Sequence, residues 1–155
     1  MIVVFYGKRN SGKTTLCREF YGWVKKNLPL RCHYLDSDKL RFVYGMKGFS
    51  TETERALIDK SIEIARYEES LNDLVLMSVS FAYDDQRKKL DEQRGVLWVY
   101  LKHDQEKRMS NKKDYTDYEE PTTGLTIDTS KVNVEDCLAN IVDEYRTFCS
   151  MNHYK

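Results

Sequence analysis

Eight consecutive residues near the start of the chain have the types and spacing of a phosphate-binding loop. Residues 7–14 read GKRNSGKT and match the pattern GxxxxGK[ST] in full. In such a loop the glycines let the backbone curl so that successive N–H groups point at phosphate oxygens, and the following helix adds its positive end. The segment therefore predicts binding of a nucleoside triphosphate. The alternative is a glycine-rich turn without a ligand, and the strand and helix patterns on either side count against it.

Within this loop, each polar residue has an expected role. Lys13 would reach the β- and γ-phosphates of the nucleotide, and the hydroxyl of Thr14 would bind Mg²⁺. The residues expected to bind the nucleotide here are Gly7, Asn10, Ser11, Gly12, Lys13, Thr14 and Thr15.

A second group of polar residues follows the apolar run at 32–35. It contains two carboxylates, Asp36 and Asp38, and a guanidinium, Arg41. In open α/β sheets, ligands bind beyond the carboxyl ends of the strands. There a carboxylate can take the proton of an attacking hydroxyl, and an arginine can hold a phosphate or sulfate. The alternative is that Ser37 or Asp38 caps the next helix and Arg41 is a surface charge.

The two segments can act together if the fold brings them to the same edge of a sheet. The hydrophobic pattern predicts such a sheet. Short apolar runs, each expected to form a strand, lie at 2–6, 32–35, 74–79, 96–101 and 125–127. Helical periodicity is expected over 13–27, 51–71, 84–94 and 134–148. Asn133 is the expected N-cap of the last helix, and Gly95 the expected stop after residue 94. Strands apolar on both faces belong in a parallel sheet covered by helices, so we predict an α/β fold.

Composition limits the class of protein. The chain has 155 residues, with 25 basic and 25 acidic side chains, so it carries no net charge that would favour a nucleic-acid coat. This length and the absence of a second core predict one domain, 1–155, with a polar, lid-like insertion at about 103–124. Four scattered cysteines and the lack of an apolar run long enough to span a bilayer predict a cytoplasmic protein without a membrane partner.

A GTPase is a further alternative, because residues 111–114 read NKKD, the guanine-reading pattern NKxD. That pattern should follow a strand directly, whereas here it lies in the polar insertion. No DxxG sequence is present in the chain to supply the magnesium-linked switch. Both points disfavour the GTPase interpretation.

Several short motifs, in order along the chain, resemble the adenylylsulfate kinase family. After the phosphate-binding loop, residues 35–41 read LDSDKLR and resemble the family's LDGDxxR. The other matches are GFS at 48–50, SF at 80–81, YEEP at 118–121 against YEPP, and IDT at 127–129. The resemblance covers nearly the whole chain. It implies a P-loop kinase with a three-layer α/β/α architecture and a mostly parallel five-stranded sheet, transferring the γ-phosphoryl group of ATP to a hydroxyl of a nucleotide-like acceptor.

The resemblance also implies roles for individual residues. Asp36, with Asp38, would assist the attacking hydroxyl or share Mg²⁺ with Thr14, and Arg108 would lie over the adenine of ATP. The expected acceptor-binding residues are Arg41, Phe49, Arg55, Ser80, Phe81, Lys112 and Lys113. For the basic residues near 108–113, a solvated charge run is the alternative.

The departures from the family pattern lie on the acceptor side. Lys39 stands where the family has Asn, residues 57–60 read LIDK in place of NIRR, and the insertion is shorter than the family's lid. The acceptor therefore stays open between adenylyl sulfate, a modified nucleotide and a hydroxymethylated pyrimidine in phage DNA. For DNA, the basic residues that could face phosphates are Lys39, Arg87, Lys88 and Lys89. A non-catalytic nucleotide-binding module is the alternative of another class, and a homodimer is possible.

Overall fold

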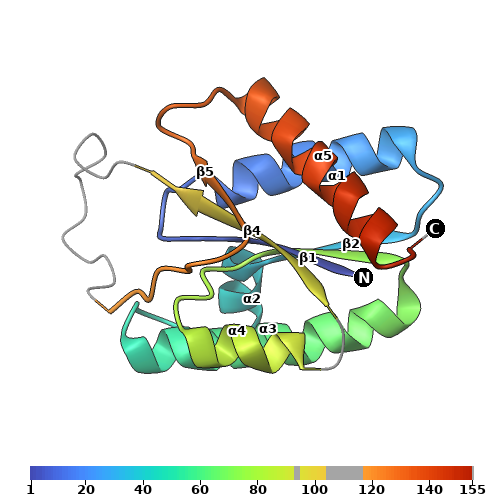
Figure 1. Cartoon of the computed structure of the whole chain (residues 1–155). Helices are drawn as coiled ribbons and strands as arrows, with labels where there is room; N and C mark the ends of the chain where they lie inside the picture. The colour runs from blue at the N-terminus through green and yellow to red at the C-terminus, as the bar shows by residue number, and fades with distance from the viewer. Residues whose placement is uncertain (93–94, 104–116, 155) are drawn as a thin grey trace.

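The computed structural model describes residues 1–92, 95–103 and 117–154. Its centre is a five-stranded sheet in the order β2-β3-β1-β4-β5, and every paired strand runs parallel to its neighbour (Figure 1). The strands are β1 (Ile2–Tyr6), β2 (Cys32–Asp36), β3 (Leu74–Ser78), β4 (Val96–Lys102) and β5 (Leu125–Asp128). The predicted α/β fold is confirmed, and the sheet is parallel throughout the described residues.

Helices cover both faces of the sheet. Helices α1 (Lys13–Asn27) and α5 (Val134–Met151) lie on one face, while α3 (Thr51–Leu71) and α4 (Asp84–Asp91) lie on the other, with the short α2 (Ser37–Val43) beside them (Figure 1). β1 and β3 are buried along their whole length because they are apolar on both faces. The result is the three-layer α/β/α arrangement expected from the resemblance.

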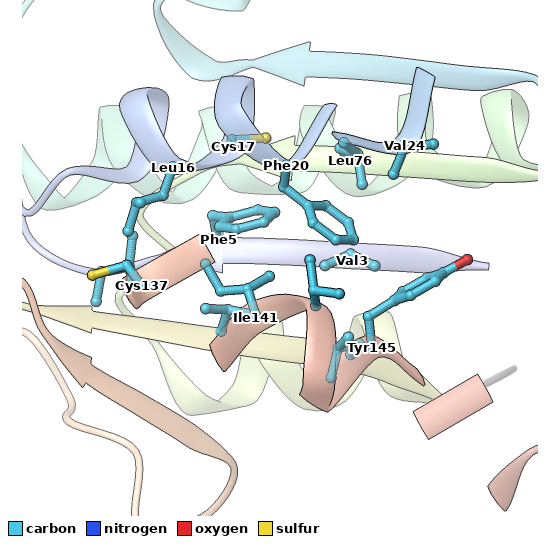
Figure 2. Packing of buried hydrophobic residues seen from close by; sticks show 14 of the residues in the cluster. Val3, Phe5, Leu16, Cys17, Phe20, Val24, Leu76, Cys137, Ile141 and Tyr145 are labelled. Carbon is cyan, nitrogen blue, oxygen red and sulfur yellow. The ribbon is translucent and has the colours of Figure 1, made fainter. Parts of the chain in front are cut away.

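The core on the α1 and α5 face is built from alternate residues of the central strands and one stripe of each helix. Val3 and Phe5 of β1 point toward this face, where Phe20 of α1 meets Tyr145 of α5 with ring centroids 5.4 Å apart (Figure 2). Phe5 packs on Phe20 at 5.9 Å. This packing fixes α1 against β1, and with it the turn that joins them.

One helix was not predicted, α4 is shorter than expected, and α5 runs to Met151 instead of residue 148. The pattern did not predict α2, since its seven residues bury just one apolar side chain, Leu40. α4 ends at Asp91 rather than at residue 94, and the Asp91 carboxylate accepts a hydrogen bond from the Val96 N–H at 3.1 Å. The expected cap of α5 is confirmed, because the Asn133 side chain accepts a hydrogen bond from the Asp136 N–H.

All four cysteines are free thiols. Cys17 and Cys137 are buried, while Cys32 and Cys149 are half-buried. Within the described ranges, no helix is long and apolar enough to cross a membrane.

After the insertion, Glu119 contacts the loop that follows β3. Its N–H donates to the Ala82 carbonyl, and its carboxylate accepts a hydrogen bond from the Asp84 N–H.

Candidate functional site

The phosphate-binding loop lies between the carboxyl end of β1 and the first turn of α1. Gly7 has φ 146°, and a Cβ there would stand 2.2 Å from the Leu101 carbonyl oxygen, so the loop leaves β1 by a path that requires glycine. Gly12 is the left-handed N-cap of α1. No side chain of the described residues caps this helix, and its first turn holds no acidic residue. The positive end of α1 is therefore not neutralised by a carboxylate of its own first turn, which favours an anion there.

Two side chains of the loop mark where phosphate would lie. The Lys13 ammonium curls back over the loop and donates to the carbonyl oxygens of Gly7 and Lys8, at 2.9 and 2.7 Å. The hydroxyl oxygen of Ser11 is buried and has no hydrogen-bond partner among the described residues. A buried hydroxyl without a partner is costly, and a phosphate oxygen is the group that would satisfy it.

The loop opens into a cavity of about 250 Å³ that extends toward α2 and α3. On the loop side the lining residues are Arg9, Asn10, Gly12, Lys13, Thr14 and Thr15. On the opposite side they are Ser37, Asp38, Arg41, Phe49, Glu54, Leu57 and Ser80. We call the first group the donor half of the cavity and the second the acceptor half. Most of the residues predicted from the two sequence segments therefore surround one cavity.

The turn after β5 supports the donor half from behind. The Thr129 hydroxyl donates to the Ser11 carbonyl at 2.8 Å and lies 3.1 Å from His103 Nδ1. A Cβ at Gly12 would meet the Thr129 methyl at 3.6 Å. The IDT motif thus contacts the phosphate-binding loop directly, although its sequence gave no hint of that role.

A second hydroxyl group lies beside Thr14, the residue expected to bind Mg²⁺. The Thr14 hydroxyl lies 3.4 Å from the hydroxyl of Ser78, the last residue of β3, which sequence reasoning did not select. Within the described residues no group of three or more His, Cys, Asp or Glu side chains could hold a metal ion. Mg²⁺ commonly takes few protein ligands and is held by substrate phosphates and water, so the residues present fit such an ion.

Asp36 and Asp38 occupy different surroundings. Asp36 is 5% exposed; its carboxylate accepts hydrogen bonds from the Tyr34 hydroxyl at 2.9 Å and from the Asp38 N–H at 2.8 Å, the latter as N-cap of α2. Burial is the largest cause that raises the pKa of the Tyr34 phenol, and the neighbouring Cys17 and Asp36 raise it further. The phenol therefore keeps its proton and donates it in this hydrogen bond. Asp38 is exposed and lines the cavity, whereas Asp36 does not. The helix cap expected at Ser37 or Asp38 is therefore Asp36.

The acceptor half contains a buried glutamate that sequence reasoning missed. Glu54, in the first turn of α3, is 1% exposed. Its carboxylate accepts a hydrogen bond from the Ser80 hydroxyl at 2.9 Å and forms an ion pair with Arg41. A signal was present, because residue 54 shares a helix face with the apolar positions 58 and 62. Ser80 and Arg41, both predicted, are thus joined through an unpredicted residue.

Phe49 lines the cavity as expected, and two guanidinium groups lie over its ring. The Arg9 guanidinium carbon is 3.8 Å from the ring centroid, and that of Arg41 is 4.6 Å away. Arg41 also donates to the Gly48 carbonyl at 2.8 Å. The aromatic face expected to stack on an acceptor base is therefore in contact with arginine.

Two further residues predicted for the acceptor lie elsewhere. The Arg55 guanidinium donates to both carboxylate oxygens of Asp85, at 2.9 and 3.2 Å, and does not line the cavity. The Phe81 ring is fully buried and packs edge-on against Trp98 at 5.1 Å, with a backbone φ of 41°. Neither side chain lines the cavity: Arg55 forms a partly exposed ion pair, and Phe81 lies in the core.

The basic residues predicted to face a polymer, or to close over ATP, divide into three groups. Arg87 is 7% exposed, and its guanidinium donates to the carbonyl oxygens of Phe81 and Glu119, so it holds the loop after β3 and does not face phosphates. Lys88 and Lys89 form ion pairs with carboxylates of the protein, and Lys39 is exposed. Arg108, Lys112 and Lys113 lie outside the described residues, as does the NKxD sequence.

Comparison with known proteins gave matches by structure alone. No protein-family model and no curated protein matches the chain. Mycobacterium tuberculosis APS kinase CysC in complex with AMPPNP and APS is 17% identical, with a TM-score of 0.75 over 94% of this chain and 96% of that one. A gluconokinase from Sinorhizobium meliloti is 14% identical (TM-score 0.73, 98% and 95%). Shikimate kinase from Aquifex aeolicus is 12% identical (TM-score 0.61, 96% and 98%). The chain therefore has the fold of the P-loop kinases, and APS kinase is among the proteins that share it.

Proposed function

We propose that the protein is an ATP-dependent phosphotransferase that moves the γ-phosphoryl group to a hydroxyl of an acceptor. The observation that supports this most strongly is the placement of Asp38 across one cavity from a complete phosphate-binding loop. The buried Ser11 hydroxyl, the Lys13 ammonium and the uncapped start of α1 are the groups that would receive the phosphates. Free thiols are in keeping with the reducing cytoplasm as its location.

In the proposed reaction the acceptor oxygen bonds to the γ-phosphorus while the bond from that phosphorus to the bridging oxygen of ADP breaks. The acceptor's proton passes to the Asp38 carboxylate, the one exposed to the cavity. Lys13 and the N–H groups of the loop stabilise the negative charge on the transferred group and on ADP. Bound Mg²⁺ would neutralise phosphate charge, and the Thr14 hydroxyl is its expected protein ligand.

Adenylyl sulfate is the first acceptor to test, because the ordered motifs point to it. We expect ADP release from Mg·ATP to depend on an added acceptor, measured against a sample without one. The further acceptors are a hydroxymethylated pyrimidine nucleotide and an oligodeoxynucleotide that contains this base.

The role of the phosphate-binding loop is tested with Lys13→Ala. We expect this change to lower the rate of ADP release at least about 100-fold, since it removes the cation at the transferred group. Lys25→Ala, which removes an exposed lysine of α1, is the matched control and should leave the rate unchanged. Retention of ATP without ADP release under any acceptor would instead identify a nucleotide-binding module.

A further inference from the structure

Glu54 places a carboxylate inside the wall of the acceptor half. It lies in the first turn of α3 on the same face as Ile58 and Ile62, which pack against the sheet. An ionised carboxylate at 1% exposure needs compensating partners. Here the partners are the Arg41 guanidinium, as an ion pair, and the Ser80 hydroxyl at 2.9 Å.

This pairing changes what Arg41 can offer to an acceptor. Its side chain is 12% exposed, one guanidinium nitrogen faces Glu54, another donates to the Gly48 carbonyl at 2.8 Å, and the group as a whole lies over Phe49. A guanidinium binds a phosphate or sulfate strongly when its charge and its forked N–H groups are available to that anion. In this cavity both are directed to groups of the protein itself.

Acidic residues outnumber basic ones in the lining of the acceptor half. Of the described residues there, Arg41 is the one basic group, whereas Asp38 and Glu54 supply two carboxylates; Arg9 and Lys13 line the donor half. An acceptor carrying a sulfate or phosphate at this position would have to displace Glu54 from Arg41 and would meet the charge of Asp38. An acceptor with hydroxyl groups would instead find hydrogen-bonding partners in Ser37 and Asp38, which line the cavity.

We propose that the acceptor half selects a polyhydroxylated alcohol that is uncharged where it enters the cavity, and that Glu54 is the specificity-determining residue. The proposal rests on the phosphotransferase function above and narrows its acceptor class. Glu54 acts by cancelling the charge of Arg41, so that an anionic acceptor such as adenylyl sulfate is disfavoured. The phosphoryl transfer itself follows the bond changes already described, with the acceptor's alcohol oxygen as nucleophile.

Equilibrium binding tests this inference without relying on turnover. Isothermal titration calorimetry on protein saturated with Mg²⁺ and AMPPNP would compare adenosine with adenylyl sulfate, two probes that share base and ribose but differ in the anionic group. We expect the wild-type chain to bind adenylyl sulfate no more tightly than adenosine. Glu54→Gln should raise the affinity for adenylyl sulfate at least tenfold and change that for adenosine less than twofold. Glu52→Gln, an exposed change of the same charge in the same turn, should leave both affinities within twofold of the wild-type values.

A double variant keeps the test decisive if Glu54→Gln does not fold. Arg41→Gln with Glu54→Gln replaces the buried ion pair by two neutral amides, and we expect it to bind adenylyl sulfate within twofold of the wild-type chain. A tenfold or greater loss would overturn the inference, because Arg41 would then bind the anion despite Glu54. Preferential binding of adenylyl sulfate by the wild-type chain would overturn it as well. If AMPPNP failed to bind the wild-type chain, the phosphotransferase proposal itself would fail, independently of the two acceptor arms.

Discussion

The two carboxylates that follow β2 show how one residue's surroundings decide its chemistry. Both oxygens of Asp36 receive hydrogen bonds from groups of the protein, the Tyr34 hydroxyl and the Asp38 N–H. Asp38 is two residues further along, on the first turn of α2, and faces the cavity. In the proposed reaction Asp38 would therefore take the acceptor's proton, while Asp36 caps the start of α2.

Separate substitutions distinguish these roles. Asp38→Asn should lower kcat by about 10²–10⁴-fold with little change in stability, because a general base is lost. Asp36→Asn should lower the free energy of unfolding by about 1 kcal/mol through its cap and the Tyr34 hydrogen bond, with a smaller effect on kcat. Steady-state kinetics and urea unfolding of both variants measure the two effects. A larger loss of kcat in Asp36→Asn would reverse the assignment.

At the scale of elements, the site depends on how β1 passes into α1. The chain leaves β1 at Gly7, beside the Leu101 carbonyl of β4, and enters α1 at Gly12. The loop is thus positioned by β4 and by α1, and the Thr129 hydroxyl binds it from the β5 side. The conformation of the loop therefore depends on these contacts and not on the loop residues alone.

Two glycines of this region give opposite expectations for the same substitution. Gly7→Ala would place a Cβ 2.2 Å from the Leu101 carbonyl at a φ of 146°, so it should lower the free energy of unfolding by at least about 2 kcal/mol and abolish ATP binding. Gly22→Ala is the control, because Gly22 lies within α1 with nothing within 4 Å of the added Cβ. It should stabilise the protein by about 1 kcal/mol. Equal effects in chemical unfolding would contradict the proposed path of the loop.

The sequence predicted the elements with strong patterns and missed those without one. All five strands were predicted because each is a compact apolar run, and α3 was predicted at its observed bounds. α2 was missed because one buried leucine sets no period. Glu54 was missed because a charged residue in a helix is ordinarily at the surface, whereas its burial depends on Arg41 from α2 and Ser80 from the loop after β3. Pairings between distant segments are not visible in local periodicity.

At the scale of the whole molecule, the free thiols make the free energy of unfolding depend on pH in the alkaline range. Burial raises the pKa of all four cysteines, that of Cys32 to about 11 and that of Cys17 well above its ordinary value. The folded chain therefore keeps protons that the unfolded chain loses above its thiol pKa of about 8.5. Because the unfolded state then binds fewer protons, the free energy of unfolding decreases as the pH rises from there toward the folded pKa values.

Cys17→Ala isolates the most buried thiol in this effect. Between pH 9 and 10 the wild-type chain should lose about 1 kcal/mol more stability than the variant, since one raised pKa contributes up to about 1.4 kcal/mol per pH unit. Denaturant unfolding at both pH values measures the difference, and the variant's own loss from the cavity cancels in the comparison. Parallel curves for the two proteins would show that Cys17 ionises alike in both states.

The packing of Trp98 also gives the protein an internal optical probe. Its indole ring contacts Phe81, which follows the cavity residue Ser80 in the chain, and its Nε1 donates to Asp91. The second tryptophan, Trp23, stacks on Phe20 in the core on the opposite face of the sheet. In a Trp23→Phe chain the remaining fluorescence would come from Trp98 alone. An acceptor that shifts Ser80 would change that emission, so binding could be followed in real time without a label.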